Sequence, residues 1–253
     1  MSAKRKLPTL PVQLLDLFFM ELTNWRWSWR TTALTSAITP MLSTIALGSF
    51  AQDSGQETLG YILTGNLVMA LMFGNQDNMA SRFAHMRFAG TLEYYATLPI
   101  NRVVLIIACV LAFFLLSLPS LLVNIIFGVF FLKIPLIVHP IILLVIPLCV
   151  LPMAGLGALI GVNARTPEES GSFSLLLTMG MLFIGPVLIP ANRLPTFLLS
   201  VGKLSPATYA ASALRQSLLS PLTGQILIDL AALLGFTLLT FWFVGHKLDW
   251  RQR

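Results

Sequence analysis

The feature that most constrains the fold is a series of six long apolar stretches, which together occupy most of the chain. Each is close to the length of about 20 residues that an α-helix needs to cross the hydrocarbon core of a bilayer. The composition agrees, because 56% of the residues are hydrophobic and only 10% are charged, whereas a soluble domain carries about 25% charged residues. We therefore expect an all-α integral membrane protein with six transmembrane helices, over residues 32–50, 59–75, 103–127, 138–162, 173–189 and 225–244.

The positions of the lysines and arginines predict the orientation of these spans. With six spans, both chain ends and the connections over 76–102 and 163–170 share one side, which leaves the other side only four of the sixteen basic residues. Basic residues concentrate in cytoplasmic loops, so we expect both termini in the cytoplasm. The single transmembrane domain (1–253) then comprises a cytoplasmic amphipathic N-terminus (1–30), a six-helix membrane part (31–244) and a cytoplasmic tail (245–253). The net charge of +6 becomes a topology signal, and we expect no nucleic-acid partner.

The N-terminal segment is amphipathic and rich in tryptophan. In a helix over residues 12–30, Trp25 and Trp29 would share one face, and Arg26 and Arg30 the adjacent one. Aromatic rings at headgroup depth, with arginines facing lipid phosphate, hold a helix along a membrane surface. We therefore expect a cytoplasmic interface helix in contact with membrane lipids. A purely anchoring role and a gating role are equally compatible with this pattern.

A second amphipathic pattern lies in the connection over residues 76–102. Met79, Phe83, Met86 and Gly90 fall at i, i+4, i+7 and i+11, which is one stripe of a helix. Such a helix could lie on the membrane surface, or it could fill a groove on a partner protein, since both uses have the same spacing. The pattern alone supports the two interpretations equally.

The segment over residues 190–223 is interrupted by four prolines, and its pieces are apolar but too short to span. Re-entrant or interfacial half-helices fit it best. Such segments persist at membrane depth only when they pack on protein or line a cavity.

Catalytic and metal-binding patterns are missing from the sequence. It contains no G-x-x-x-x-G-K-[ST] phosphate loop. His85, His139 and His246 fall in different connections, without metal-ligand spacing. Asp229 is the candidate ionisable residue inside a span, and its place about one turn into the last stretch favours an interfacial position. We expect no metal, no catalytic residues and no enzymatic site on this chain, and an ion-coupled carrier is disfavoured.

Two motifs carry a resemblance to a known family. Residues 87–102 read RFAGTLEYYATLPINR, with a G-T-L-E core and a Pro-x-Asn-Arg ending before the third span. Further on, Leu194-Pro195 is followed by Pro206-Ala207-Thr208-Tyr209 and then Leu214-Arg215. With the six spans between which they lie, these motifs resemble the permease subunits of type-2 ABC exporters, most closely those of the drug, antibiotic and lipid branch.

This resemblance implies a division of labour. Two permease copies, commonly a homodimer, would form the path, and two separate ABC ATPase subunits would bind from the cytoplasm. No cofactor would be bound by this chain, while ATP and Mg²⁺ would sit on the partner. The connection between spans two and three would form the coupling helix that seats on the ATPase. Its implied contact residues are Met79, Arg82, Phe83, Met86, Arg87, Gly90, Thr91, Leu92 and Glu93.

The resemblance also assigns roles at the two membrane faces. Trp25, Arg26, Trp29 and Arg30 would belong to the interface helix at the cytoplasmic gate. Pro195, Pro206, Tyr209 and Arg215 would belong to the outside re-entrant segment. One departure concerns docking: the family often carries Glu-Arg-Glu before the glycine, and here residues 85–88 read HMRF. The carboxylates that would pair with a basic ATPase surface are thus missing.

The function expected from the sequence is that of the membrane-spanning subunit of an ATP-driven exporter in a bacterial or archaeal plasma membrane. Its substrate would be hydrophobic or amphipathic, such as a drug, an antibiotic or a lipid. The alternatives are a polysaccharide or glycoconjugate exporter permease and a non-transporting membrane scaffold. The substrate itself is not encoded in any motif of the sequence.

Overall fold

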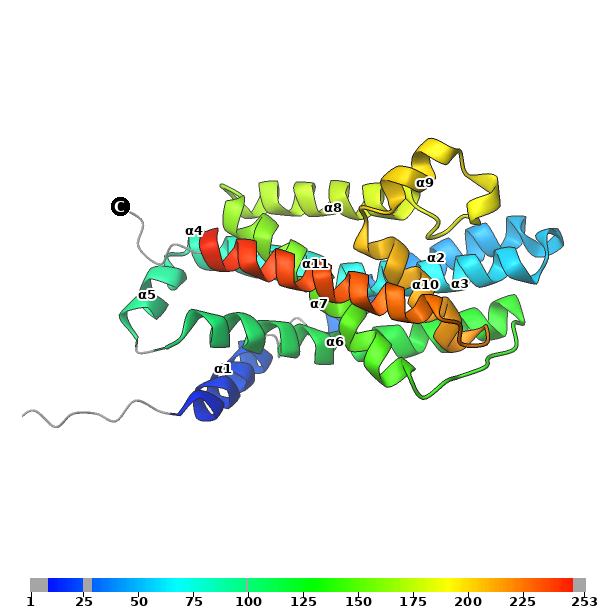
Figure 1. The fold of residues 1–253 in the computed structure, drawn as a ribbon. Helices are drawn as coiled ribbons and strands as arrows, with labels where there is room; N and C mark the ends of the chain where they lie inside the picture. Colours follow the sequence, from blue (N-terminus) through cyan, green and yellow to red (C-terminus); the bar gives the residue numbers. More distant parts are fainter. Residues whose placement is uncertain (1–8, 25–28, 99, 248–253) are drawn as a thin grey trace, which may run out of the picture.

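The computed structural model describes residues 9–24, 29–98 and 100–247, and within these ranges the chain is helical, with no strand. The long helices lie roughly along one axis as an elongated bundle, from which α1 leaves at an angle (Figure 1). In chain order the helices are α1 (Leu10–Asn24), α2 (Trp29–Phe50), η1 (Gln52–Ser54), α3 (Gln56–Leu71), η2 (Met72–Asp77), α4 (Asn78–Phe88), α5 (Thr91–Thr97), α6 (Arg102–Leu132), α7 (Ile142–Asn163), α8 (Pro167–Ile184), η3 (Ala191–Arg193), α9 (Thr196–Gly202), α10 (Pro206–Leu218) and α11 (Gln225–Lys247). The predicted all-α class is confirmed.

Four helices of the described chain are long and apolar enough to cross a membrane on their own: Thr32–Phe50 within α2, and α6, α7 and α11. The other two expected spans coincide with α3 plus η2 and with α8. The helix α8 starts and ends earlier than the predicted span over 173–189. It ends at Ile184 because Pro186 disfavours helical backbone at Gly185, which is extended. The total of six spans stays a prediction.

The helix α3 continues without a break through η2 and α4, as one helical segment from residue 56 to residue 88. At 1.5 Å per residue it is about 50 Å long, well beyond the roughly 30 Å of a hydrocarbon core. The connection that we expected from residue 76 onward therefore begins as a direct extension of a bundle helix. In η2 the backbone is π-helical, and such turns are often found at functional sites.

The helices α4 and α7 approach each other backbone to backbone. A Cβ atom at Gly157 would overlap the carbonyl oxygen of Gln76, and one at Gly161 would overlap the carbonyl oxygen of Ala80. Small residues at this four-residue spacing allow two membrane helices to pack closely. The close approach fixes α4 against the bundle and buries the face that it turns toward α7.

The segment between α8 and α11 contains the short helices α9 and α10. Pro195 precedes α9, and Pro206 is the first residue of α10, where proline's missing N–H is no loss. The Tyr209 hydroxyl donates to the carbonyl oxygen of Lys203 (2.9 Å). The Arg215 guanidinium lies 3.4 Å from the ring centroid of Tyr61 on α3, a cation–π geometry. Prolines thus divide this segment into short helices, and its re-entry into the membrane stays a prediction.

Asp229, for which the sequence favoured an interfacial position, lies on α11 and is buried. Its carboxylate accepts hydrogen bonds from Gln216 (3.0 Å) and Gln225 (3.2 Å). The bond from Gln216 joins α10 to α11, whereas the bond from Gln225 lies within α11. Together they give the buried carboxyl group hydrogen-bond partners, which is a structural role.

The N-terminal helix is shorter than the helix expected over residues 12–30. It ends at Asn24, and Trp29 and Arg30 begin α2 instead. The side chain of Trp29, and Trp25 and Arg26 entirely, lie outside the described residues. The predicted sharing of faces by these residues across a single helix therefore does not extend to Trp29 and Arg30.

Candidate functional site: the α4–α5 corner

The chain turns sharply between α4 and α5, at the end of the bundle opposite α9 (Figure 1). Gly90 makes this turn in the left-handed region, with φ of 68°, where a side chain is unfavourable. After α5, the Asn101 side chain accepts a hydrogen bond from the backbone N–H of Val103 (3.0 Å) and caps α6. We call residues 87–95 the corner. This segment contains the whole G-T-L-E core of the sequence motif.

The stripe of Met79, Phe83 and Met86 is part of the protein's own core. These side chains are at most 1% exposed and pack with residues of α6 and α7. The prediction that they contact an ATPase subunit is corrected on this point, because they are not available at the surface. The physical reason is that Gly157 and Gly161 on α7 admit α4 so closely that its apolar face is covered from within the chain.

Two aromatic side chains of the corner that were not in the predicted contact set reach the surface: Phe88 is 71% exposed and Tyr94 61% exposed. Of the predicted set, Arg87 and Glu93 are exposed, while Gly90, Thr91 and Leu92 are partly buried. Large exposed aromatic side chains beside charges are typical of the anchors of a protein interface. The exposed surface of the corner is therefore formed by Arg87, Phe88, Glu93 and Tyr94, which we call its tip, and not by the stripe of Met79, Phe83 and Met86.

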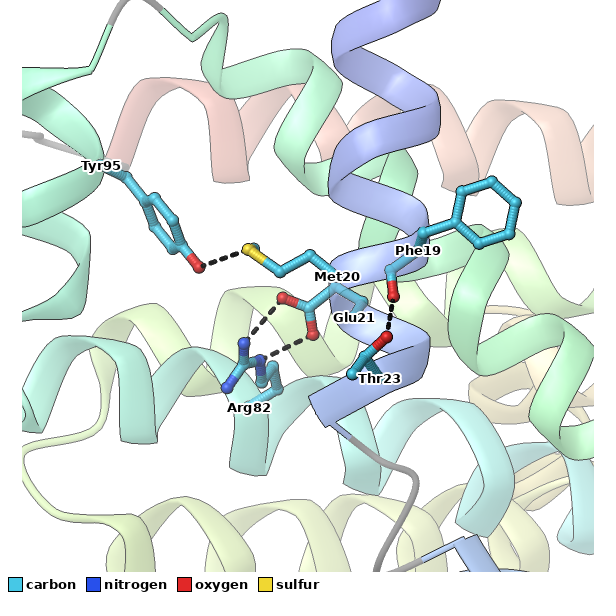
Figure 2. Close-up of polar contacts among 6 residues, drawn as sticks. All are labelled: Phe19, Met20, Glu21, Thr23, Arg82 and Tyr95. Atoms are coloured by element: carbon cyan, nitrogen blue, oxygen red, sulfur yellow. Dashed lines mark hydrogen bonds and ion pairs between the residues drawn. The ribbon is translucent and has the colours of Figure 1, made fainter.

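Arg82, predicted to contact a partner, instead binds α1. Its Nε donates to Oε2 of Glu21 (2.9 Å) and its Nη2 donates to Oε1 (2.7 Å), as Figure 2 shows. Glu21 is fully buried, and the Arg82 side chain is 19% exposed. Burial lowers the pKa of Arg82, but the hydrogen bonds and the charge of Glu21 outweigh this and raise it above its usual value. The two-pronged geometry is the strongest kind of arginine–carboxylate contact, and it joins α1 firmly to α4.

Two further contacts extend this junction to α5 and to the start of α6. The Tyr95 hydroxyl donates to the sulfur of Met20 at 3.7 Å (Figure 2), and burial, followed by the nearby charge of Glu21, raises the pKa of Tyr95. The backbone N–H of Asn101 donates to Oε1 of Gln13 (3.4 Å). The helix α1 therefore touches α4, α5 and the cap of α6 together.

Arg87 ties the corner to the other side of the bundle. Its Nη1 donates to the carbonyl oxygens of Val162 and Ala164 (3.3 Å to the latter), at the end of α7, where a cation also complements the helix dipole. The neighbouring end of α11 is attached there as well, through Lys247 Nζ and Asn163 Oδ1 (2.9 Å). The corner is thus joined to α7 and α11 as well as to α1.

The start of α8 beside this junction is capped by its own side chains. The Thr166 hydroxyl accepts from the backbone N–H of Glu169 (3.2 Å), and the Glu169 carboxylate accepts from the N–H of Arg165 (2.7 Å). The pKa of exposed Glu168 is lowered, first by a backbone hydrogen bond and then by one from Thr166. The Thr-Pro-Glu-Glu run could have identified this cap, because a Thr followed three residues later by Glu marks a helix start. No local sequence pattern identifies Glu21 as a site residue, because its partner Arg82 lies 61 residues away in the chain.

A comparison with protein-family models places residues 13–219 in the family described as ABC-2 type transporter. The chain belongs to the ABC-2 type transporter family. A search of the curated proteins found no match. As an ABC-2 chain it is a membrane permease subunit of an ABC transporter and a multi-pass membrane protein. Such permeases are transport components that generally lack their own ATPase site and generally pair with an ABC ATPase subunit. The matched range begins within α1 and includes the corner, the Glu21–Arg82 pair and α10.

Proposed function

We propose that this ABC-2 permease is the membrane-spanning subunit of an ATP-driven exporter whose ATPase subunits dock on the tip of the α4–α5 corner. The observation that carries the proposal is the combination of exposed Phe88 and Tyr94 with the internal attachment of the same corner to α1 and α7. An exposed anchor that is rigidly joined to several bundle helices is the arrangement that a coupling element requires.

In this proposal, ATP and Mg²⁺ are bound by the partner subunit, and this chain binds neither. Two copies of the chain, each with its ATPase, form the path. Both termini lie in the cytoplasm of a bacterial or archaeal cell, on the side of the corner. The tip of the corner and the C-terminal end of α11 lie at the same end of the bundle (Figure 1), which supports this orientation.

The substrate in this proposal is hydrophobic or amphipathic, such as a drug, an antibiotic or a lipid. Large apolar side chains are exposed along α2, α6 and α8; examples are Leu34 on α2, Leu122 on α6 and Leu176 on α8. In a membrane such faces border either lipid tails or another copy of the chain. A path formed between two such surfaces would favour an apolar cargo over a heavily hydrated one.

The mechanism follows from the attachments of the corner. Nucleotide-driven closure of the ATPase subunits would displace Phe88 and Tyr94. The displacement would pass along α4 into η2 and α3, which form one helical segment with it. The Glu21–Arg82 pair would move α1 in the same step. Closure of the ATPase subunits would thus move both α3, which belongs to the bundle, and α1, which leaves the bundle at an angle.

The test is co-expression with ABC ATPase subunits from the same genome, followed by co-purification. Phe88→Asp and Tyr94→Asp should each weaken capture of the ATPase by about thirtyfold or more, as for an interface anchor worth about 2 kcal/mol. Phe197→Asp is the matched control, because Phe197 is 73% exposed but lies on α9, at the opposite end. Undiminished capture by both corner variants would refute docking at the tip. Failure of any ATPase to bind the unaltered chain would refute the exporter assignment.

A further inference from the structure

The helix α8 turns a polar face toward the rest of the bundle, at whose edge it lies (Figure 1). Its buried residues are Ser170, Ser174, Thr178 and Leu182, at successive spacings of four, so they form one stripe. Three of the four carry hydroxyl groups, whereas Leu176, off the stripe, is exposed. Serine and threonine join membrane helices by hydrogen bonds across their interface. The attachment of α8 therefore depends largely on polar contacts.

The partners of this polar stripe lie on η2. The Gln76 Nε2 donates to the hydroxyl oxygen of Thr178 (2.9 Å) and to the carbonyl oxygen of Ser174 (3.4 Å). The Ser174 hydroxyl donates to the carboxylate of Asp77. Gln76, Ser174 and Thr178 are at most 1% exposed, and Asp77 is partly buried. The π-helical turn thus presents an amide and a carboxyl group, adjacent in the chain, to the hydroxyl groups of α8.

On another side, η2 is held by backbone packing. The carbonyl oxygen of Gln76 lies so close to Gly157 of α7 that a Cβ atom there would overlap it. Two backbones in such contact cannot separate without moving a whole bundle helix. The contacts of η2 with α8 are instead hydrogen bonds made by side chains. The helix α8 is therefore the neighbour of η2 whose attachment a change in one side chain can alter.

The carboxyl group of Asp77 has hydroxyl partners, rather than a cation, in the part of the chain that the structure describes. It lies two residues beyond the span expected over 59–75, toward the corner. Burial raises the pKa of Asp77 from the usual 3.8 to about 6, and the hydroxyl groups of Ser174 and Thr178, which lower it, offset this only in part. Burial penalises the charged form of a carboxyl group. The closed site therefore favours the neutral form.

No charged neighbour contributes to this shift among the described residues. The helices that pack against η2 are α2, α3, α4, α6, α7 and α8. Their titratable groups in the described chain are those of Arg30, Glu57, Tyr61, Arg82, His85, Arg87, Arg102, Cys109, Cys149, Glu168 and Glu169. Of the two arginines on α4, Arg82 pairs with Glu21, and Arg87 binds carbonyl oxygens at the end of α7. The protonation of Asp77 thus depends on whether its site is closed or open to water.

We propose that Gln76 and Asp77 on η2, with Ser174 and Thr178 on α8, form a proton-sensitive latch, which holds α8 against the bundle while the carboxyl group is neutral and releases it when the group is charged. The neutral group keeps hydroxyl partners without burying a charge. The charged group is more stable in water, which it reaches when α8 moves away. The latch belongs to the chain itself and does not depend on the ATPase partner.

The pH range of the latch follows from the pKa of Asp77, about 6 in the closed site against 3.8 in water. Because the closed site binds the proton more tightly, the latched form is favoured fully below pH 3.8, and this preference is lost as the pH rises through about 6. The ratio of latched to released chains should therefore fall roughly tenfold between about pH 5 and about pH 8.

The test measures the distance between α4 and α8 in the full chain, in lipid nanodiscs, by double electron–electron resonance. Spin labels on Ser81→Cys and Ser172→Cys report on the two helices, since both positions are exposed, whereas Cys109 and Cys149 are buried. Dilution with unlabelled chain ensures that each labelled chain reports its own distance. The ratio of the short-distance to the long-distance population should fall roughly tenfold over the same pH range.

Three variants identify the sensor. Asp77→Asn should stay at the short distance at both pH values, because its amide, like the neutral carboxyl group, carries no charge. Ser174→Ala should lower the latched fraction at both pH values, and size-exclusion chromatography reports whether it is folded. His85→Gln is the matched control on α4, because histidine is the side chain whose charge ordinarily changes in this pH range, and it should keep the full response.

A distance that does not change with pH in the unaltered sequence would overturn the proposal and leave Asp77 a fixed structural role. A response that persists in Asp77→Asn would also overturn it, because another group would then be the sensor. Loss of the response in His85→Gln would assign the sensor to α4 instead of η2, with the same consequence.

Discussion

Replacing Arg82 by alanine should destabilise the protein strongly, because it leaves a fully buried carboxylate without its partner. Both oxygens of Glu21 are bonded to Arg82, at 2.9 and 2.7 Å. Removing one member of such a buried pair costs about 3–5 kcal/mol. The Arg82 side chain is 19% exposed, so water can reach part of the vacated space, and we expect a loss near the lower bound, about 3 kcal/mol.

The two members of the pair should not be equivalent. Glu21→Gln keeps an acceptor oxygen and leaves the remaining charge on the partly exposed Arg82, so we expect a smaller loss, about 1–2 kcal/mol. The double variant Glu21→Met with Arg82→Met removes both charges. Replacement of a buried pair by apolar side chains is often neutral or stabilising, so it should lie within about 1 kcal/mol of the unaltered chain.

The assay is reversible unfolding in mixed micelles, followed by circular dichroism, for the two single variants and the double variant. Arg102→Ala serves as the control, because exposed arginines away from such features change stability by about 0.5 kcal/mol or less. The reasoning is wrong if Arg82→Ala is no more destabilising than Arg102→Ala. It is also wrong if the double variant is less stable than Arg82→Ala, because an uncompensated buried charge would then not be the cause.

Gly161→Ala should lower stability by about 1–3 kcal/mol in the same unfolding assay, because the new Cβ meets the backbone of α4, which cannot move aside as a side chain can. Gly171→Ala, on the open side of α8, should be neutral or stabilising by up to about 1 kcal/mol, and equal effects of the two would contradict the close packing of α4 on α7. Gly90→Ala should cost about 1 kcal/mol through its left-handed backbone, whereas Gly90→Asn should cost less, and the unfolding midpoints of the two decide this. Thr166→Ala should cost about 1 kcal/mol by removing the cap of α8, and Thr166→Ser should restore most of it; no difference between them would show that the cap contributes nothing.

The helical architecture could be predicted because it depends on the lengths of apolar stretches, which a sequence displays directly. The helices α2, α6, α7 and α11 cover most of the stretches expected for them. The ends of helices are harder to predict where a residue one or two positions beyond the last helical residue determines where the helix stops. Pro186 ends α8 early by its effect on Gly185, although the residues beyond it are apolar enough to continue a span.

The sequence motif points to the chain segment that forms the corner, but the sequence does not show which side chains of that segment are exposed. The stripe of Met79, Phe83 and Met86, which was expected at the surface, is buried. Helical periodicity indicates that one face of α4 is apolar, but a face that packs inside the chain has the same period as one that docks. Gly157 and Gly161, which allow α7 to pack closely on this face, are present in the sequence. Which helix packs against them depends on the tertiary fold and cannot be read from the sequence.

In the proposed docking, the attachments of the corner would let it transmit a displacement rather than absorb it. A two-helix projection held only by its ends would bend at Gly90, its weakest backbone position. Here α4 is braced on one side by Arg82 and Glu21 and on the other by Arg87 at the end of α7. Bending α4 would break bonds to buried or carbonyl partners on both sides, so movement of the whole unit with α1 costs less. A partner pressing on Phe88 and Tyr94 would therefore shift α1 and the long α3–η2–α4 segment together.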